Sequence, residues 1–409
     1  MRILFLTHRL PYTPNRGDRT RAFYLLREMS RFADVSLFSL VHDDEELSHR
    51  QTVPFTRDVT CLRVRRLPNL LRGAFRLPTP RPLTHSLLDA VGARATLETL
   101  SSDRRPDLVV AFCSGMARFA VEPPLDRYPF VLDMVDVDSV KWRQLAEVTR
   151  APLRWIYRRE ARTLSAFEAL AASRAQTTLV VNERERAALA RIAPSAEVRV
   201  LPVGIDVEAF QPANPPTTSP EVIFCGVMDY EPNTRGVAWF AGQVWPRVRS
   251  AIPAARFTIV GSAPTRAVRN LAKHDPSIAV VANVPSVQPY LWKAAVSIAP
   301  LHLAQGLQTK VLEALAAGLP VVVTPAVLKG LPVDTQQGCL AADDAAAFAD
   351  GVIAMLSMSP AERRRRAALA PVQTLHWSEQ LRSLEGILKR GMSQSRRVLQ
   401  AVPHARSGS

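Results

Sequence analysis

Short apolar runs alternate along the first half of the chain with longer stretches in which apolar residues recur at helical spacing. The apolar runs predict buried strands at residues 3–6, 35–40, 108–113, 130–135, 178–181 and 198–201. Residues 19–31 and 154–172 have the pattern of helices. Strands separated by helices are typical of parallel βαβ units, so the first half predicts a doubly wound parallel sheet.

The same alternation begins again in the second half of the chain. It predicts strands at residues 222–225, 256–260, 278–281, 297–299 and 321–323. Residues 211–220 are polar and rich in proline, which favours a linker between two domains. We therefore predict an α/β protein with a first domain at 1–205, a linker at 206–220 and a second domain at 221–377. A helix at 378–390 is expected to pack back on the first domain, ahead of a disordered basic tail at 391–409.

The composition agrees with two globular domains. The chain has 409 residues, of which 47% are hydrophobic and 22% charged, and it lacks an apolar run long enough to span a membrane. Four cysteines lie far apart in the sequence: Cys61, Cys113, Cys225 and Cys339. This spacing suits free thiols in a reducing compartment and neither zinc nor disulfides, so a cytoplasmic location is expected.

The net charge of +15 is unevenly distributed along the chain. Residues 1–205 carry +9 and residues 361–409 carry +7, whereas residues 206–360 carry −1. The positive excess predicts an anionic partner. We find no nucleic-acid reader motif, so an anionic membrane surface fits better than nucleic acid. A peripheral position on the inner face of the cytoplasmic membrane would agree with this charge.

Two stretches mix Leu, Phe and Trp with arginine, as interfacial helices do. They are residues 62–77 and residues 154–162. The alternative is a surface helix whose apolar stripe faces the core.

Residues 304–323 carry the most specific chemistry of the second half. Gly306 lets the backbone pass close to a ligand, and residues 307–317 read as one helix that begins there. The amides at a helix start, with Lys310 in the first turn, suit phosphates. Glu313 lies one turn further on the same face, where it could bind ribose hydroxyls. A solvated ion-pair face is the alternative for this Lys–Glu spacing.

A glycine-containing basic loop follows the first predicted strand. Arg16, Gly17, Asp18 and Arg19 stand just before or within the start of the first helix. Such a loop can bring arginines and helix amides to an anion. The alternative is a solvated loop. No GxGxxG pattern occurs, which argues against a dinucleotide oxidoreductase.

Asp133, Asp136 and Asp138 come at the end of a predicted strand. The Asp-Val-Asp pattern can hold a metal, but it is short and lies in a first domain that a complete second domain follows. We interpret Asp136 and Asp138 as residues near an acceptor and not as metal ligands. No cofactor and no metal are expected.

The ensemble of these segments resembles a known family. Asp136-Val-Asp-Ser-Val-Lys-Trp142, Gly226-Val-Met-Asp-Tyr-Glu-Pro-Asn233 and Lys310-Val-Leu-Glu-Ala314 are similar to motifs of family 4 glycosyltransferases associated with exosortase (PEP-CTERM) gene clusters. The similarity runs from Met1 to about Trp377. It implies a GT-B architecture of two Rossmann-like domains, with ligands in the cleft between them.

The resemblance implies roles for individual residues. Its donor-binding positions are Gly226, Gly306, Leu307, Lys310 and Glu313. Gln305 would contact the donor sugar, and Asp136 and Asp138 would join it as the catalytic set. Arg16, Gly17, Asp18 and Arg19 would form an acceptor or phosphate loop.

The chain also departs from the family pattern. Gln305 replaces the first acid of the family 4 pair, and His302 stands where arginine is expected. Val227 and Pro232 occupy the positions of the Arg and Lys that usually hold the diphosphate. Arginine forks are good diphosphate ligands, so their loss bears on donor binding.

The implied activity is transfer of a sugar from a nucleoside-diphosphate-sugar to a lipid-linked or saccharide acceptor, with retention, in exopolysaccharide biosynthesis. Two alternatives remain open. One is a non-catalytic GT-B scaffold or partner subunit, which the missing basic residues favour. The other is a sugar-nucleotide epimerase, which would bind the nucleotide without needing an acceptor.

Overall fold

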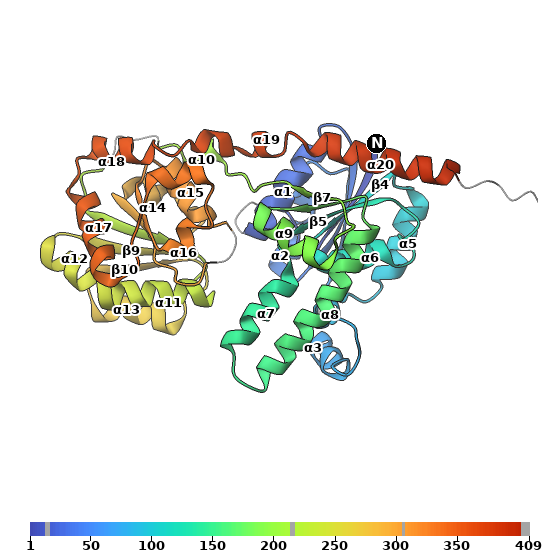
Figure 1. Ribbon diagram of the computed structural model, residues 1–409, viewed down its shortest axis with the longest axis horizontal. Helices are drawn as coiled ribbons and strands as arrows, with labels where there is room; N and C mark the ends of the chain where they lie inside the picture. Colours follow the sequence, from blue (N-terminus) through green and yellow to red (C-terminus); the bar gives the residue numbers. More distant parts are fainter. Residues whose placement is uncertain (13–16, 213–216, 305–306, 402–409) are drawn as a thin grey trace, which may run out of the picture. The chain divides into compact units, whose positions relative to one another are not determined.

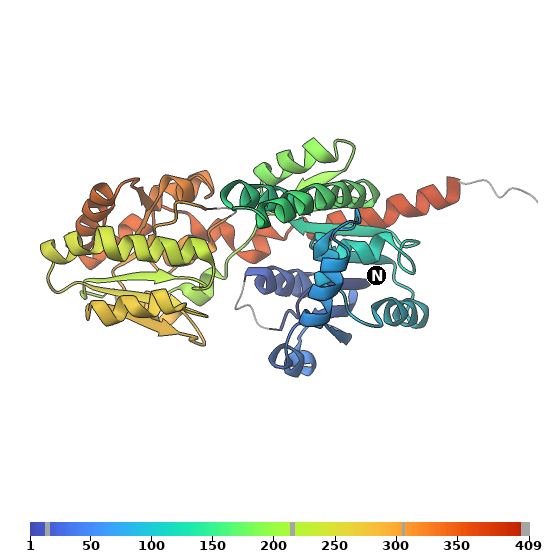
Figure 2. The ribbon, with the colours of Figure 1, turned by 90° about the horizontal axis from the view of Figure 1, so that it is seen from below.

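The computed structural model describes residues 1–12, 17–212, 217–304 and 307–401. The chain divides into two compact units. Unit 1 comprises Met1–Val203 and Gln380–Ser409, and unit 2 comprises Gly204–Glu379. In each unit, helices cover both faces of one parallel sheet (Figures 1 and 2). The predicted α/β fold class with two doubly wound parallel sheets is confirmed.

The sheet of unit 1 has the order β3-β2-β1-β4-β5-β6-β7. Its strands are β1 (Arg2–Thr7), β2 (Asp34–Val41), β3 (Asp58–Arg63), β4 (Leu108–Phe112), β5 (Phe130–Val135), β6 (Thr177–Val180) and β7 (Val198–Val200). Its α-helices are α1 (Gly17–Met29), α2 (Asp44–Ser48), α3 (Arg66–Phe75), α4 (Leu83–Leu87), α5 (Ala93–Asp103), α6 (Ser114–Val121), α7 (Asp138–Val148), α8 (Leu153–Arg174), α9 (Glu183–Ile192) and α20 (Leu384–Ala401). A 3-10 turn, η1 (His49–Thr52), follows α2.

The sheet of unit 2 has the order β10-β9-β8-β11-β12-β13. Its strands are β8 (Glu221–Cys225), β9 (Arg256–Gly261), β10 (Ile278–Ala282), β11 (Val296–Ala299), β12 (Val321–Val323) and β13 (Cys339–Ala341). Its α-helices are α10 (Val207–Phe210), α11 (Glu231–Trp239), α12 (Trp245–Ala251), α13 (Arg266–His274), α14 (Gln288–Lys293), α15 (Thr309–Ala316), α16 (Pro325–Leu328), α17 (Ala345–Ser357) and α18 (Pro360–Ala367). Shorter or irregular turns are η2 (Phe240–Val244), η3 (Val333–Gly338) and η4 (Val372–Leu375), and α19 (Trp377–Gln380) spans the boundary between the units.

Both strand orders reverse direction once, between β1 and β4 in unit 1 and between β8 and β11 in unit 2. In a doubly wound sheet, the loops at the carboxyl ends of the strands diverge at this point and leave room for a ligand. A ligand site is therefore expected at the carboxyl ends of the strands on either side of the reversal in each sheet.

Two strands were not predicted from the sequence. β3 lies at the edge of its sheet, and its residues are half-buried or exposed. It therefore lacks the continuous apolar run that marks a strand buried on both faces. β13 is a three-residue edge strand next to β12. Its run is too short to be recognised by periodicity.

The segment predicted as a linker is part of unit 2 where the structure describes it. The boundary between the units falls at Val203–Gly204, and α10 lies inside the predicted linker. Val207 and Phe210 of α10 are buried in the core of unit 2. Apolar burial of this short helix therefore overrides the polar, proline-rich composition that follows it.

The C-terminal helix differs in its bounds from the prediction at 378–390. α20 begins at Leu384 and continues to Ala401, into the part predicted to be a disordered tail. It belongs to unit 1 and contacts β5, β4 and α1. Leu384, Ile387 and Leu388 are buried there, and Gly391 lies so close to the sheet that a Cβ would come within 3.2 Å of Val131 Cγ2.

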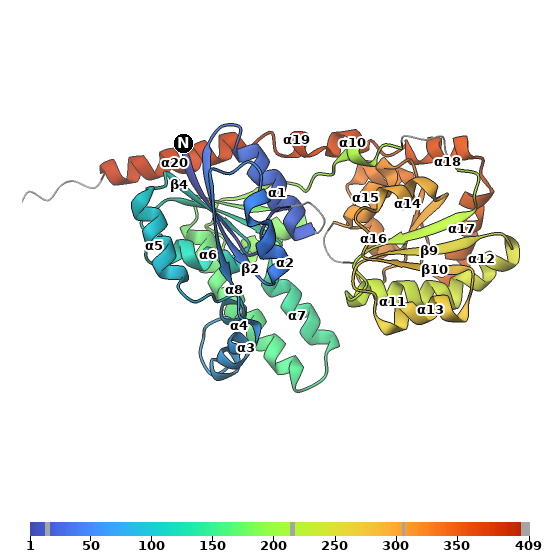
Figure 3. The same ribbon diagram turned by 180° about the vertical axis from the view of Figure 1, so that it is seen from behind.

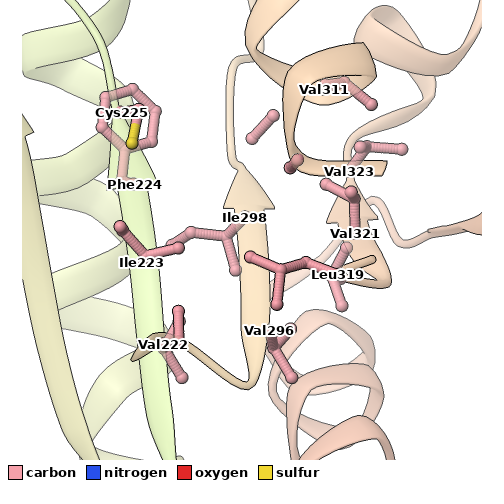
Figure 4. Packing of buried hydrophobic residues seen from close by; sticks show 14 of the residues in the cluster. Val222, Ile223, Phe224, Cys225, Val296, Ile298, Val311, Leu319, Val321 and Val323 are labelled. Carbon is pink, nitrogen blue, oxygen red and sulfur yellow. The ribbon is translucent and has the colours of Figure 1, made fainter. Parts of the chain in front are cut away.

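Each unit has its own apolar core around the central strands. In unit 2, apolar side chains of β8, β11 and β12 pack together with Val311 of α15 and with Leu319, which precedes β12 (Figure 4). Val222, Ile223, Ile298 and Val322 are all 1% exposed or less. This packing fixes the carboxyl ends of β8 and β11 beside each other.

A buried ion pair ties α1 to β5 in unit 1. Arg21 Nε lies 3.0 Å from Asp133 Oδ2, and Arg21 Nη1 donates to Pro202 O at 3.1 Å. Asp133 is fully buried and Arg21 is 1% exposed. Asp133, the first of the three aspartates at this strand end, therefore has a structural partner.

Replacing Asp133 with asparagine should destabilise the protein. In Asp133→Asn, the Arg21 guanidinium stays buried without its counter-charge, so the free energy of unfolding should fall by about 3–5 kcal/mol. Urea unfolding followed by circular dichroism measures this difference.

Two further variants test that explanation. Arg21→Met combined with Asp133→Leu removes both charges and should recover most of the lost stability. Arg31→Met removes an exposed pair with Glu28 and should cost under about 1 kcal/mol. Equal unfolding midpoints for Asp133→Asn and the wild type would show that the pair does not support the fold.

Candidate functional site

The reversal point of the sheet in unit 2 brings together the turn after β8 and helix α15. Gly226 follows β8, and Lys310 is in the first turn of α15, which begins after the loop that follows β11. Because β8 and β11 are neighbours, these segments meet although they are far apart in sequence. A Cβ on Gly226 would lie 3.0 Å from Lys310 Nζ. The absent side chain at Gly226 therefore makes room for the ammonium group.

Lys310 is half-buried and held by neutral groups. Its Nζ donates to Asn233 Oδ1 at 2.7 Å and lies 4.6 Å from the centroid of the Phe224 ring. Within the described part of the chain, no carboxylate lies within ion-pair distance of this nitrogen. Burial lowers the pKa of Lys310 to about 8, so the group is still largely protonated at neutral pH. The result is a partly desolvated cation that forms no ion pair with the described residues, although the nearby Glu313 carboxylate partly offsets the fall of its pKa.

Asn233 fixes the turn after β8 as well as the lysine. Its Nδ2 donates to Val227 O at 2.8 Å, and Thr234 Oγ1 donates to Met228 O at 2.7 Å. Both residues lie in α11, so the first turn of this helix holds the turn 226–230 in place. Asn233 thus links the β8 turn to Lys310. The sequence analysis assigned Asn233 to a family motif but gave it no role.

Glu313 lies one turn after Lys310 in α15 and is half-buried. Burial raises its pKa to about 7, and the positive charge of Lys310 opposes this rise. Its carboxylate makes no hydrogen bond or ion pair with the residues that the structure describes. It is therefore available to accept hydrogen bonds from a ligand.

The turn after β8 packs closely against the end of β9. Gly226 N donates to Val260 O at 3.0 Å, and a Cβ on Gly261 would lie 1.7 Å from Gly226 O. Only a residue without a side chain fits at Gly261. Two glycines therefore set the position of the backbone at the carboxyl edge of the sheet.

The remaining residues that were predicted or expected at the donor site lie partly inside and partly outside the described residues. α15 begins at Thr309, two residues after the predicted start, and Leu307 is half-buried just before it. Gln305 and Gly306 lie outside the described residues. At the positions where basic residues were expected, Val227 is 37% exposed and Pro232 is the second residue of α11. His302 is exposed and packs edge-on against Trp239, with the ring centroids 4.6 Å apart.

The carboxyl edge of the sheet in unit 1 holds Asp136 and Asp138. Asp138 begins α7, is half-buried, and accepts a hydrogen bond from Ser114 Oγ at 2.9 Å. Asp136 is exposed, yet the surrounding chain partly desolvates its carboxyl and raises its pKa to about 6, with Glu185 and Asp138 adding negative charge. The two predicted residues therefore lie at one strand end.

Two buried glutamates hold the backbone around these aspartates. Val137 N donates to Glu185 Oε2 at 2.9 Å, and Ser139 N donates to Glu168 Oε1 at 3.2 Å. Val135 just before them has φ of 67°, an unfavourable value for a β-branched residue. The sequence analysis missed both glutamates because nothing in the local sequence marks either acid as one that turns inward to the backbone of another segment.

His8 and Cys113 line the neighbouring strand ends. His8 Nδ1 lies 3.4 Å from Cys113 Sγ, and its ring stacks on that of Phe112 at a centroid distance of 5.8 Å. Cys113, with φ of 70°, precedes α6. The ring of His8 therefore packs against other residues of unit 1.

The basic loop after β1 is only partly described. Arg16 lies outside the described residues, Gly17 opens α1, and Asp18 follows it in the helix. Arg19 is buried, where it lies 3.4 Å from Glu46 and donates to Tyr12 Oη at 3.0 Å. The charge of Arg19 is therefore balanced inside unit 1.

Two features are absent from the described residues, a metal-binding cluster and a membrane-spanning helix. No cluster of three or more His, Cys, Asp or Glu side chains suited to a metal ion occurs among them. The expected absence of a metal and of a cofactor stays a prediction. No helix in the described part of the chain is both long and apolar enough to cross a membrane.

One known family matches the part of the chain that contains this candidate site. Residues 219–358 match the family described as "Glycosyl transferases group 1". This range contains Gly226, Asn233, Lys310 and Glu313. Comparison of the sequence with curated proteins finds no match.

Solved structures share the fold of almost the whole chain. TarM of S. aureus, in complex with Fondaparinux, alpha-GlcNAc-glycerol and UDP, has a TM-score of 0.66 at 9% identity, with 95% of this chain and 100% of that chain covered. A UDP-forming trehalose-phosphate synthase of Burkholderia xenovorans has a TM-score of 0.63 at 14% identity, covering 95% and 98%. Anabaena Alr3699/HepE, with UDP and glucose, has a TM-score of 0.58 at 13% identity, covering 98% and 100%. These likenesses show that the chain has the GT-B type of fold.

Adding a side chain at Gly226 should disturb the site and destabilise unit 2. In Gly226→Ala, the Cβ would meet Asn233 Nδ2 at 2.9 Å and Lys310 Nζ at 3.0 Å. Overpacking of this kind costs about 1–3 kcal/mol of unfolding free energy, which denaturant titration measures.

Gly242→Ala is the matched control, because nothing lies within 4 Å of a Cβ at that position. Gly242 lies in a helical segment of the same unit, so alanine should leave stability unchanged or raise it slightly. Equal stability of Gly226→Ala and Gly242→Ala would contradict the close approach at Gly226.

Proposed function

We propose that this protein is a glycosyltransferase that moves a sugar from a nucleoside-diphosphate-sugar donor to a lipid-linked or saccharide acceptor. The observation that carries the proposal is the environment of Lys310. Its ammonium is partly desolvated and contacts a neutral amide and an aromatic ring. A cation in this state gains from an anionic ligand, because the ligand replaces lost hydration with a charge-assisted hydrogen bond.

The donor site follows from the neighbours of Lys310. The diphosphate would bind Lys310, and the Glu313 carboxylate would accept hydrogen bonds from the ribose hydroxyls. Gly226 and Gly261 keep side chains away from the backbone between β8 and β9. Gln305, Gly306 and Leu307 precede α15 in sequence and would contact the sugar and the diphosphate. The match of residues 219–358 to group 1 glycosyl transferases supports this assignment.

The structural neighbours favour a nucleoside diphosphate as the ligand. The TarM and HepE structures are complexes with UDP, and the Burkholderia xenovorans synthase is UDP-forming. Transfer with retention would require the protein to position both substrates and to stabilise the leaving diphosphate. Lys310 would provide that stabilisation.

On the acceptor side we propose Asp136 and Asp138. Ser114 holds one oxygen of Asp138, and this fixes the carboxylate for an acceptor hydroxyl. Asp136 is open to solvent and would contact polar groups of the same acceptor. Arg16, Gly17 and Asp18 would complete this side, whereas the buried pair with Glu46 gives Arg19 a structural role. The similarity of residues 136–142 to exosortase-associated transferases supports a role in exopolysaccharide biosynthesis at the inner face of the cytoplasmic membrane.

One observation favours a second candidate, a non-catalytic scaffold of the same fold. Val227 is exposed at a position where a basic residue is expected to hold the diphosphate, and Pro232 occupies the other such position. A scaffold would not bind the donor. An epimerase would bind it but would not need Asp136 or Asp138.

Calorimetric titration of the full chain with UDP, GDP and ADP tests the donor site. We expect binding of one nucleoside diphosphate, and we expect Lys310→Met to weaken it by about tenfold or more, since charge-assisted hydrogen bonds contribute about 1.5–3 kcal/mol. Glu313→Ala should weaken it similarly. Binding should also weaken above a pH of about 8, where Lys310 loses its proton.

Glu231→Ala is the matched control, because Glu231 is a 79% exposed acid in the same unit and pairs only loosely with Arg235 at 4.0 Å. It should leave the affinity unchanged. Absence of binding by all three nucleotides would overturn the transferase and epimerase interpretations together and leave the scaffold.

Asp138→Asn tests the acceptor side. Asparagine can still accept from Ser114, so the fold should persist, whereas loss of the carboxylate should lower the transfer rate by about 10²–10⁴-fold if it acts as a general base. Donor affinity should not change. Asp126→Asn, at an exposed acid of the same unit, serves as the control. Full transfer activity in Asp138→Asn would remove this residue from the catalytic set.

A further inference from the structure

Helix α3 exposes its most apolar residues to solvent. Leu67, Leu70, Leu71 and Phe75 are 74%, 58%, 65% and 85% exposed. Their spacing of three and four places them on one face of the helix. A surface helix of a soluble domain usually turns such a face toward the core, whereas α3 turns its apolar face toward solvent.

The inward face of α3 is polar and small. Asn69 and Gly73 are the buried residues of this helix. Asn69 Nδ2 donates to Leu87 O at 3.1 Å and to Asp89 O at 2.7 Å, and Gly73 faces Ser86 of α4. These contacts fix the rotation of the helix about its axis. The leucines therefore point outward because the hydrogen bonds of Asn69 and the close packing of Gly73 hold the opposite face of α3 against the protein.

The segment that carries α3 is tied to the long helix α8. Arg159 of α8 donates from Nε to Leu77 O at 2.8 Å and from Nη2 to Arg81 O at 2.8 Å. Glu160 accepts from Leu83 N at 2.7 Å at the start of α4. Side chains of α8 thus hold the segment that follows α3, and these hydrogen bonds do not involve the apolar face of α3.

The turn between α7 and α8 exposes a second apolar group. Val148, Leu153 and Trp155 are 70%, 48% and 67% exposed. Trp142 and Tyr157 pack together with ring centroids 5.2 Å apart and hold the two helices as a pair. α3 and the α7–α8 pair project from the same side of unit 1 in two opposite views (Figures 1 and 3).

Exposed arginines lie on the same segments, and none of them forms an ion pair within the described part of the chain. They are Arg65, Arg66, Arg81, Arg143, Arg150, Arg158 and Arg162. Residues 62–81 contain no acidic residue. An apolar face bordered by unpaired arginines complements a surface whose interior is apolar and whose boundary is anionic.

We propose that α3 and the α7–α8 turn form the surface by which this protein docks on an anionic lipid bilayer. The exposed faces of α3 and Trp155 enter the boundary between headgroups and acyl chains, and the arginines contact lipid phosphates. A second copy of the chain would place arginines against arginines, which opposes self-association through this surface. Docking rests on the proposed function in one respect, because a lipid-linked acceptor would lie in the bilayer that this surface contacts. Binding to the bilayer does not itself require binding of the sugar donor.

Sedimentation of the full-length protein with vesicles tests the proposal. We expect it to sediment with vesicles of phosphatidylcholine and phosphatidylglycerol, and much less with phosphatidylcholine alone. Leu71→Ser combined with Phe75→Ser should lower the partition coefficient by about tenfold or more, because two apolar side chains no longer enter the lipid. Arg65→Gln combined with Arg66→Gln should reduce the preference for phosphatidylglycerol.

Matched controls lie on other surfaces. Leu369→Ser with Val333→Ser removes two apolar side chains of unit 2 that are 49% and 78% exposed, and Arg184→Gln with Arg266→Gln removes two exposed charges. Both controls should bind vesicles like the wild type. A blue shift of tryptophan fluorescence on adding vesicles, reduced in Trp155→Phe, would place Trp155 in the lipid.

Several outcomes would overturn the docking surface. One is equal partitioning of Leu71→Ser/Phe75→Ser and its control. Another is a concentration-dependent dimer, detected by light scattering without vesicles and lost in that variant, which would assign the surface to a second copy. Nucleotide affinity is measured separately, so unchanged nucleotide binding with lost vesicle binding, or the reverse, distinguishes failure of one proposal from failure of the other.

Discussion

The partly desolvated ammonium of Lys310 is the interaction on which the candidate donor site depends. A cation withdrawn from water needs compensation, and here Asn233 and the ring of Phe224 provide it without neutralising the charge. This arrangement requires the β8 turn, the first turn of α11 and the first turn of α15 to meet at one point. The strand order of unit 2 brings them together, and Gly226 and Gly261 allow the backbones to approach closely enough.

In unit 1, by contrast with Lys310 in unit 2, buried arginines form ion pairs with buried carboxylates. Arg21 and Asp133, and Arg19 and Glu46, are pairs in which each charge is met inside the unit. Glu168 and Glu185 accept hydrogen bonds from backbone amides and so fix the turn that carries Asp136 and Asp138. The buried groups fix the backbone, and the carboxylates of Asp136 and Asp138 remain more accessible. The acid-rich strand end therefore contains both buried structural acids and accessible ones.

The apolar residues of α3 show how packing decides between two orientations that periodicity leaves open. The sequence of residues 62–77 allowed either an interfacial helix or a surface helix with its stripe toward the core. Hydrogen bonds of Asn69 to two carbonyl groups, together with the missing side chain of Gly73, turn the stripe outward. Neither residue attracts notice in the sequence, because one polar residue and one glycine are common in surface helices.

The sequence by itself determined the α/β class, the two parallel sheets and the position of most central strands. It could do so because strands buried on both faces require continuous apolar runs, whose spacing from the helices is visible in the chain. It also placed Lys310 and Glu313 on one helix face, since helical spacing is a local property. Only the tertiary structure decided which residues from distant segments meet: Asn233 with Lys310, Glu185 with Val137, and α10 with the core of unit 2. Those contacts depend on strand order and on the exact fit of side chains and backbones, and local sequence patterns do not encode them.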